Sequence, residues 1–147
     1  MLKKNVGNIL KLFISKKDYK ERLPKDEIEL GFGGVVDDKF YDKDINRSVL
    51  LATTDSYELT KQNKIDIDYG TLGENILMDF NPYNLDIGTK LQISEVVLEI
   101  SQRCPICNHL SSIKQNLPKL LKKDRGIFAK VISNGTIKIG DSIIIID

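Results

Sequence analysis

The sequence predicts a mainly β fold, a barrel-like or curled sheet with a few short helices. Several short segments rich in isoleucine and valine alternate with turn signals, whereas only two or so segments carry the signals of a helix. This balance disfavours a parallel sheet built from strand–helix–strand units. Closure into a barrel would also remove the exposed edges that such apolar strands otherwise present.

The first third of the chain holds two strand signals. Val6 to Ile14 is rich in β-branched and large apolar residues, which predicts a strand, and Ser15 to Glu29 reads as a charged, solvated stretch. Gly31-Phe32-Gly33-Gly34 then allows positive φ or a close backbone approach, and Val35-Val36 suggests a short strand. The glycines are weak evidence for phosphate binding, because neither a strong preceding strand nor a following helix is evident.

The middle of the chain combines strands with a helix. Ser48 to Ala52 has the pattern of a buried strand. Asp55 and Glu58 have the spacing of a capping box, which predicts a short helix that ends at about Asn63. Leu91 to Ile100 is the longest β-type segment and is predicted as one strand.

The last third predicts one more helix and a closing β meander. Pro118 to Lys123 has proline near its start and lysines at its end, as a short helix would. Asn134-Gly135 is the strongest hairpin signal, because both residues tolerate the positive φ of a type I′ turn, and Gly140-Asp141 marks a second turn. The predicted strands of the meander are Phe128 to Ile132, Thr136 to Ile139 and Ser142 to Ile146.

Composition indicates one domain and excludes some classes of partner. The 147 residues contain 41% hydrophobic and 29% charged residues, and no repeat or linker divides them. Lys+Arg (22) and Asp+Glu (21) nearly cancel, which argues against a nucleic acid or an anionic membrane as partner. No signal peptide is evident, and no apolar run approaches the roughly 20 residues that span a bilayer. The sequence therefore predicts a cytoplasmic protein.

The stretch ISQRCPICNHL contains both cysteines, Cys104 and Cys107, and the single histidine, His109. A thioredoxin-type dithiol is disfavoured, because in that fold the motif comes early, within a βαβ unit. A structural zinc site lacks a second pair of ligands, although a three-ligand site with an open position remains open. A small buried thiol is the expected state of Cys104, with His109 as a solvent-facing residue. The remaining interpretation is that one of the two cysteines acts as a single functional thiolate.

A series of short motifs runs through the chain in one order. Its members are Gly70-Thr71-Leu72-Gly73-Glu74-Asn75-Ile76, Ile87-Gly88, Gln102 with Cys107 in the ISQxxxxCxxL context, Asp124-Arg125-Gly126-Ile127-Phe128-Ala129, Gly135 and Gly140-Asp141. Each motif alone is weak, but the ordered set resembles the MOSC domain, the molybdenum cofactor sulfurase C-terminal family, in its stand-alone bacterial form. The resemblance covers roughly residues 6 to 146, so residues 1–147 are read as a single MOSC domain.

The resemblance implies a compact β-barrel in which Cys107, rather than Cys104, faces a cleft. In members of the family that are enzymes, the cysteine at this position ligates the molybdenum of a pterin cofactor. A thiolate suits that role because it is a soft, charged metal ligand, and it can also accept sulfur as a persulfide. Cys107 is therefore the expected metal ligand and catalytic residue, and molybdenum cofactor is the expected cofactor.

Four further residues are candidates for cofactor binding. Glu74 and Asn75 either orient the ligand or close a turn by bonding backbone amides. Arg125 either binds the cofactor phosphate through its guanidinium fork or complements a helix dipole. Arg47 is a weaker phosphate candidate.

One part of the family pattern is missing. Many members carry Gly-x-x-Gly-Asp-x-His where this chain has Gly31 to Asp37, so that aspartate and histidine are absent at the corresponding positions. Any role of those two side chains cannot be carried over to this chain. The following Arg47-Ser48-Val49-Leu50-Leu51 again resembles the family, which makes the departure local.

The resemblance implies two alternative functions. The first is a molybdenum-dependent oxidoreductase that reduces N-hydroxylated compounds with an external electron donor, since the chain has no flavin, haem or iron–sulfur signature. The second is a non-enzymatic carrier that delivers sulfur or cofactor to a partner protein. Pyridoxal phosphate is associated with the sulfurase proteins, where a separate domain carries it, and nothing in this sequence supports such a domain.

Overall fold

The computed structural model describes residues 3–103 and 126–146, and this part of the chain is mainly β. The predicted fold class is confirmed. The elements are β1 (Lys3–Ile14), β2 (Leu23–Lys25), β3 (Glu27–Gly31), β4 (Gly34–Val35), the 3₁₀-helix η1 (Ile45–Arg47), β5 (Val49–Thr53), α1 (Thr54–Gln62), β6 (Ile76–Met78), β7 (Lys90–Ile93), β8 (Val96–Arg103), β9 (Ile127–Ser133), β10 (Gly135–Lys138) and β11 (Ser142–Ile146).

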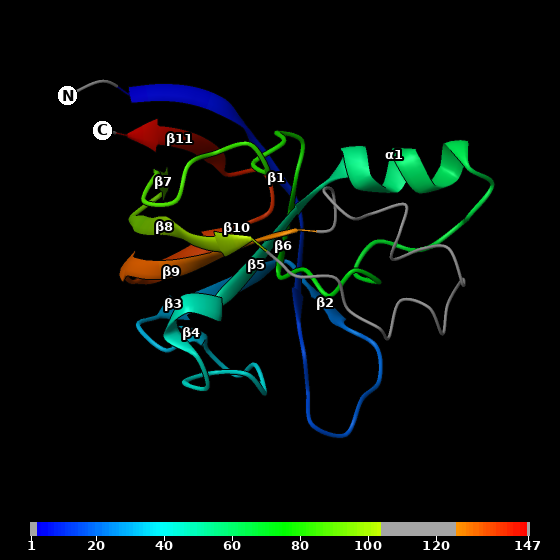
Figure 1. Ribbon diagram of the computed structural model, residues 1–147. Helices are drawn as coiled ribbons and strands as arrows, with labels where there is room; N and C mark the ends of the chain where they lie inside the picture. The colour runs from blue at the N-terminus through cyan, green and yellow to red at the C-terminus, as the bar shows by residue number, and fades with distance from the viewer. Residues whose placement is uncertain (1–2, 104–125, 147) are drawn as a thin grey trace.

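Seven strands close into a barrel in the order β1, β11, β7, β8, β9, β5 and β6, with β6 returning to β1 (Figure 1). Closure depends on β1, which pairs with β11 through residues 3–8 and with β6 through residues 9–12. Register shifts between Asn5 and Gly7 and between Ile9 and Lys11 interrupt these two ladders. Such irregularities bend a strand, as a strand shared by two neighbours in a barrel requires. β2 adds to the end of β1 outside the closed ring.

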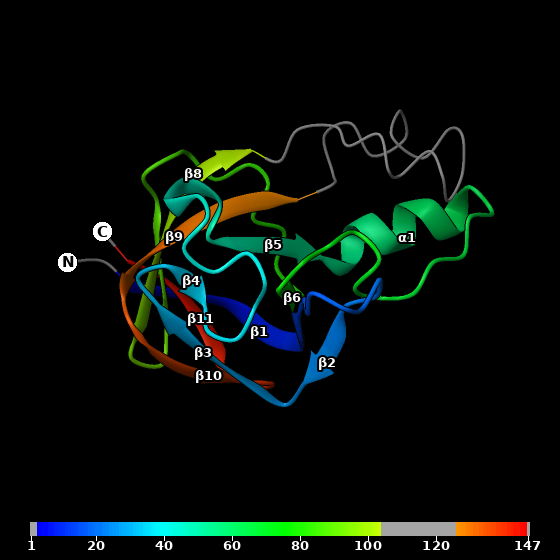
Figure 2. The same cartoon turned by 90° about the horizontal axis from the view of Figure 1, so that it is seen from below.

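β5 and β6 form the parallel pair of the barrel, and the connection between them runs through α1 (Figure 2). Both faces of these two strands are covered. Leu51, Ile76 and Met78 belong to the barrel core, whereas Leu77 packs with Tyr57 of α1 in a second apolar cluster. This double burial explains why both strands read as continuous apolar runs rather than as alternating patterns.

A second, three-stranded sheet in the order β10, β3 and β4 packs against the barrel. Its side chains Leu30, Val35 and Ile137 are buried in the same apolar cluster as the barrel residues. One continuous core therefore joins the two sheets. None of the helices among the described residues is long and apolar enough to cross a membrane.

The segment predicted as one strand from Leu91 to Ile100 is a hairpin. β7 and β8 pair antiparallel with Ile93 opposite Val96, and Ser94 and Glu95 form the turn. Ser94 takes a φ of 54°, an uncommon value for a residue with a side chain. The single-strand prediction was wrong because the turn lacks the glycine or asparagine that usually signals positive φ.

The predicted closing meander is also wrong in its pairing, although its three strands are present. β9 pairs with β8 and β5, β10 with β3, and β11 with β1 and β7. Asn134-Gly135 therefore passes the chain from one sheet to the other instead of closing a hairpin. The turn at Gly140-Asp141 is confirmed, since the Asp141 amide donates to the Lys138 carbonyl at 3.1 Å and Gly140 has a φ of 93°.

Two smaller corrections concern the first half of the chain. The residue that caps α1 is Thr53, whose hydroxyl accepts from the Asp55 amide at 3.5 Å, and not Asp55 as the capping-box spacing suggested. The stretch from Ser15 to Glu29 is mostly exposed, as expected, but it also contains β2 and the start of β3, which were not predicted. The predicted helix from Pro118 to Lys123 lies outside the described residues.

Gly34 is expected to be the glycine whose replacement disturbs this fold most. Its φ is +120°, and a Cβ atom built there would lie 2.8 Å from the Ser48 carbonyl oxygen. Gly34→Ala should therefore lower the free energy of unfolding by about 2–4 kcal/mol, because backbone strain and a backbone clash add. Urea denaturation measures the change. The matched control is Gly88→Ala, which has a φ of +98° but open space around its Cβ, and equal losses in the two variants would disprove the clash.

Candidate functional site

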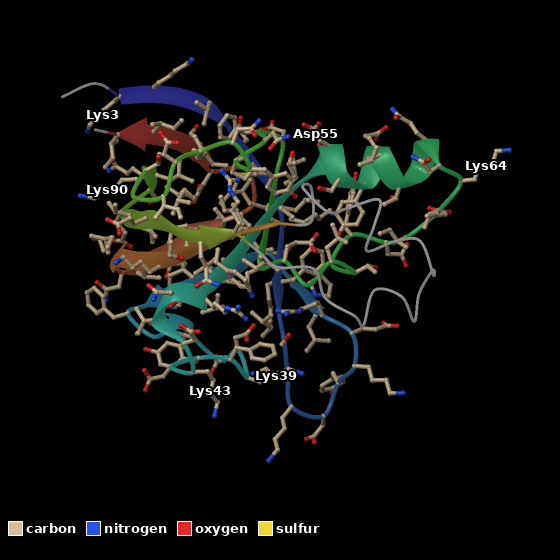
Figure 3. All side chains as sticks on the ribbon, in the orientation of Figure 1. Lys3, Lys39, Lys43, Asp55, Lys64 and Lys90 are labelled. Atoms are coloured by element: carbon tan, nitrogen blue, oxygen red, sulfur yellow. The ribbon has the colours of Figure 1, made fainter. Side chains whose placement is uncertain are left out.

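A cavity of about 950 Å³ lies where three connecting segments meet. The segments are the connection from β1 to β2, the connection from β4 to β5 and the residues 68–75 that precede β6. The lining is completed by strand residues: Phe13 of β1, Pro24 of β2, Leu50 of β5 and Phe128 of β9. Phe40 and Tyr69 in its wall are about half exposed, so the cavity opens to solvent. Lys39 and Lys43, labelled in Figure 3, lie on the connection from β4 to β5.

The lining combines cationic groups with flat apolar surfaces. Its cations are Lys20, Arg22, Lys39, Lys43 and Arg47, its aromatic residues are Phe13, Phe40, Tyr69 and Phe128, and its carboxylates are Glu21, Asp38, Asp44 and Asp68. Asp38 and Asp44 face the guanidinium groups of Arg22 and Arg47 at 3.6 and 4.0 Å. Aromatic faces suit a planar ring, and guanidinium groups suit a phosphate. The cavity can therefore accept a planar ligand that carries an anionic group.

Asn75 ties three parts of the cavity wall together. Its side-chain oxygen accepts from the Leu50 amide at 3.0 Å, and its side-chain nitrogen donates to the Phe13 carbonyl and to Asp38, each at 3.2 Å. Its backbone amide donates to the Leu50 carbonyl and its carbonyl accepts from the Phe13 amide, both at 2.8 Å. Asn75 as a whole residue is 6% exposed, so these bonds form away from water.

Asp38 is a buried carboxylate that organises the next part of the wall. Its oxygens accept from the amides of Ser15 at 2.8 Å and Phe40 at 2.9 Å, in addition to the bond from Asn75. Its ion pair with Arg22 holds that guanidinium near the Phe40 ring, 5.6 Å from the ring centroid. A buried charge needs such compensation, and here it comes from backbone amides, one amide side chain and one cation.

In the sequence, Glu74 lies between Gly73 and Asn75, which both line the cavity. Its own carboxyl is fully buried next to Tyr57 of α1. One carboxyl oxygen, Oε2, accepts from the Tyr57 hydroxyl at 2.6 Å and from the Gly70 amide at 3.0 Å. Within the described residues, Oε1 has no hydrogen-bond partner. Tyr57 in turn accepts from the amides of Gly70 and Leu72 at 3.1 and 3.3 Å. The pair thus fixes the loop from Gly70 to Gly73, which borders the cavity.

Burial raises the pKa of Glu74, although the bonds from Tyr57 and Gly70 and the charge of Arg22 act in the opposite direction. Burial, together with the charge of Glu74 and the bond to it, also raises the pKa of Tyr57. Tyr57 is therefore a neutral donor at physiological pH. The unpartnered oxygen and the raised pKa both favour the protonated form of the Glu74 carboxyl in the folded state.

Arg47 ends η1 and lines the cavity with its side chain 46% exposed. Its guanidinium lies over the Phe128 ring, 5.5 Å from the centroid. With the Gln102 amide oxygen turned toward Arg47, that oxygen accepts from Nε at 2.8 Å and from Nη2 at 3.3 Å. Gln102 of β8 and Phe128 of β9 therefore hold the Arg47 guanidinium in place.

The predicted site residues fall into three groups. Arg47 and Asn75 line the same cavity, whereas the Glu74 side chain is buried next to it. The side chains of Glu74 and Asn75 accept hydrogen bonds from backbone amides, which is one of the two roles considered for them. Cys107 and Arg125, together with Cys104 and His109, lie outside the described residues.

Three residues that organise this site were missed in the sequence: Arg22, Asp38 and Tyr57. Asp38 directly follows the Gly31 to Asp37 stretch in which the aspartate and histidine of the family pattern are absent, but no spacing marked it. Tyr57 belonged to the predicted helix, where its partner Glu74 could not be foreseen.

Residues 3–103 and 126–146 contain no group of three or more histidine, cysteine, aspartate or glutamate side chains arranged to hold a metal ion.

The family model of the MOSC domain matches residues 26–144. The fold is similar to the crystal structure of YuaD from Bacillus subtilis, with a TM-score of 0.84 and 13% identity over 98% of this chain and 97% of that one. It is also similar to YiiM from Geobacillus stearothermophilus (TM-score 0.72, 13% identity, 99% and 76% covered) and YiiM from Escherichia coli (0.70, 17%, 95% and 70%). A search of curated proteins gives no match.

Proposed function

Because this chain belongs to the MOSC domain family, we propose that it binds molybdenum cofactor, with Cys107 as the ligand of the metal and the cavity beside Arg47 as the seat of the pterin. The observation that carries the proposal is the chemistry of the cavity lining. A pterin is a planar heterocycle and its cofactor form carries a phosphate, and the lining offers both aromatic faces and guanidinium groups.

The size of the cavity is compatible with this ligand. Cavities that hold small molecules and cofactors measure roughly 300–1,000 Å³, and this one measures about 950 Å³. Phe40 and Tyr69 offer half-exposed rings on which a planar group can stack. The residues present therefore fit the cofactor that the family implies.

The proposed roles of the residues follow from their chemistry. Arg47 binds the phosphate, with Arg125 as a second proposed phosphate ligand, while Glu74 and Asn75 keep the wall of the cavity in place. Cys107 follows the end of β8 in sequence, and its thiolate is a soft donor suited to molybdenum. When bound, the cofactor would supply a metal centre that exchanges an oxygen atom and electrons with a substrate.

Cofactor retention tests the proposal. The protein and its variants Cys107→Ser and Cys104→Ser are purified from a host that makes molybdenum cofactor, and molybdenum and fluorescent pterin oxidation products are quantified. We expect molybdenum near one per chain in the parent protein, a loss of at least about tenfold in Cys107→Ser, and little change in Cys104→Ser. Circular dichroism checks that all three proteins are folded.

Four results would contradict the proposal. Zinc in place of molybdenum in the parent protein would indicate a zinc site, and absence of any metal would leave only thiol or persulfide chemistry. Equal losses in the two serine variants would point to a dithiol or zinc site that uses both cysteines. Retention of molybdenum by Cys107→Ser would remove Cys107 from the set of ligands.

Turnover separates the two functions that the family suggests. The first is reduction of N-hydroxylated compounds by an external electron donor, and the second is delivery of sulfur or cofactor to a partner protein. The molybdenum-loaded protein is given reduced donors and a panel of N-hydroxylated bases and amidoximes. Consumption of a substrate supports the reductase, whereas no turnover combined with transfer of cofactor to an acceptor apoenzyme supports the carrier.

A further inference from the structure

Arg47 rests on a pair of residues that face each other across two strands. Gln102 of β8 and Phe128 of β9 are direct cross-strand partners in the antiparallel ladder. The Phe128 ring lies under the guanidinium at 5.5 Å, and the Gln102 oxygen accepts from Nε and Nη2 at 2.8 and 3.3 Å. The guanidinium is thus held both by a ring face and by a hydrogen-bond acceptor.

The strand β8 is shaped locally for this contact. Its register with β9 shifts between Ile100 and Gln102, so Ser101 stands at a bulge of the ladder. The Ser101 hydroxyl donates to the carbonyl of Asn46, the residue before Arg47. A bulge re-aims the side chains that flank it. Here the bulge fastens η1 to β8 through two adjacent residues, Ser101 and Gln102.

We propose that Gln102 is a positioning residue, which holds Arg47 at the cavity wall so that its remaining N–H groups can bind the phosphate of a planar, phosphorylated ligand. The inference rests on the proposed function, because it concerns the same cavity. A guanidinium has five N–H donors, and the two bonds to Gln102 use one on Nε and one on Nη2. Three donors are then not used by Gln102.

The neutral amide matters because it fixes the arginine without cancelling its charge. A carboxylate at the same place would form an ion pair with Arg47 and weaken its attraction for a phosphate. Asp44 is such a carboxylate, but it lies 4.0 Å from Nε with its side chain 55% exposed, so water screens it.

Binding of two probes to the cofactor-free protein tests this inference. Guanosine 5′-monophosphate and guanosine share the amino-oxo-pyrimidine ring of a pterin and differ only in the phosphate, so their affinity ratio reports the phosphate subsite. Isothermal titration calorimetry at one low ionic strength measures this ratio for the parent protein, Gln102→Leu, Gln102→Glu, Arg47→Ala and the double variant Arg47→Ala/Gln102→Leu.

We expect the parent protein to prefer the phosphorylated probe by roughly tenfold or more. Gln102→Leu should reduce that preference about three- to tenfold, and Gln102→Glu should reduce it more while the thermal midpoint stays within a few degrees. Arg47→Ala should abolish it. Because Gln102 acts through Arg47, the double variant should be no weaker than Arg47→Ala, which is the non-additive result of a double-mutant cycle.

Several outcomes would overturn the inference. These are equal affinity of the parent protein for the two probes, an unchanged ratio in both Gln102 variants, and additive losses in the double variant. A Gln102 variant that weakens both probes equally would show a merely structural role. Cofactor retention separates this inference from the proposed function: a Gln102→Leu protein that keeps molybdenum and the full phosphate preference refutes the inference alone. A parent protein that prefers the phosphate but never retains molybdenum refutes only the function.

Discussion

Replacement of Asn75 by alanine is expected to lower the free energy of unfolding by about 3–5 kcal/mol. The change removes three side-chain hydrogen bonds, to Leu50, Phe13 and Asp38, in a buried region. A buried polar group left without its partner costs about 1–3 kcal/mol, and the buried carboxylate of Asp38 would lose one of its donors. Urea denaturation followed by circular dichroism measures the loss.

Two further variants make this prediction specific. Asn75→Asp keeps the size of the side chain but places a carboxylate next to Asp38, so at neutral pH it should destabilise the protein at least as much as alanine and recover partly in acid. Asn63→Ala removes an exposed bond to the Leu59 carbonyl and should cost less than about 1 kcal/mol. A loss below about 1 kcal/mol in Asn75→Ala, together with loss of cofactor, would show instead that Asn75 acts on a ligand.

Stability is expected to fall with rising pH because of Glu74, and Glu74→Gln should remove that part of the dependence. The pKa of Glu74 is raised in the folded protein above its value in the unfolded chain. The folded state therefore binds the additional proton, and the stabilisation is complete below the unfolded pKa and is lost as pH rises through the folded pKa. Glutamine cannot ionise, so its variant lacks this decline.

Denaturant titrations of the parent protein and of Glu74→Gln across pH 4 to 9 check this expectation. As pH rises, the free energy of unfolding of Glu74→Gln should increase relative to that of the parent protein. A difference that does not change with pH would show that Glu74 has the same pKa in the folded and unfolded states. Glu74→Ala should cost about 2–4 kcal/mol in acid, because Tyr57 and the Gly70 amide lose their acceptor and a void remains. Its cost should decrease toward high pH, where the buried charge that it removes is unfavourable.

The sequence predicted those parts of the fold that depend on local pattern. The runs at Val6 to Ile14 and Ser48 to Ala52 became β1 and β5, because apolar β-branched residues indicate strands wherever their partners lie. The pairing of the last three strands was missed, since β9, β10 and β11 each choose partners far away in the chain. The turn at Ser94 was missed because serine gives no signal of positive φ.

The candidate site shows the same division. The Gly73-Glu74-Asn75 motif and Arg47 were found because short patterns identify them, and Arg47 and Asn75 do meet at one cavity. The contacts that hold them were not predicted. Asn75 bonds to Phe13, 62 positions away, and Arg47 rests on Gln102 and Phe128 of two later strands. Such contacts exist only after the barrel has closed, so a pattern within one segment carries no information about them.

The pairing of residues 3–8 with residues 142–146 has a consequence for synthesis of the protein. While the ribosome still holds the last strand, that part of β1 lacks the neighbour that covers its edge, and the ring cannot close. An uncovered strand edge is a template for pairing with other chains. Ring closure through contacts of such long sequence separation is also slow. Newly made chains should therefore depend on dilution or on chaperones until β11 emerges, and shortening the chain before residue 142 should yield aggregates rather than a smaller folded barrel.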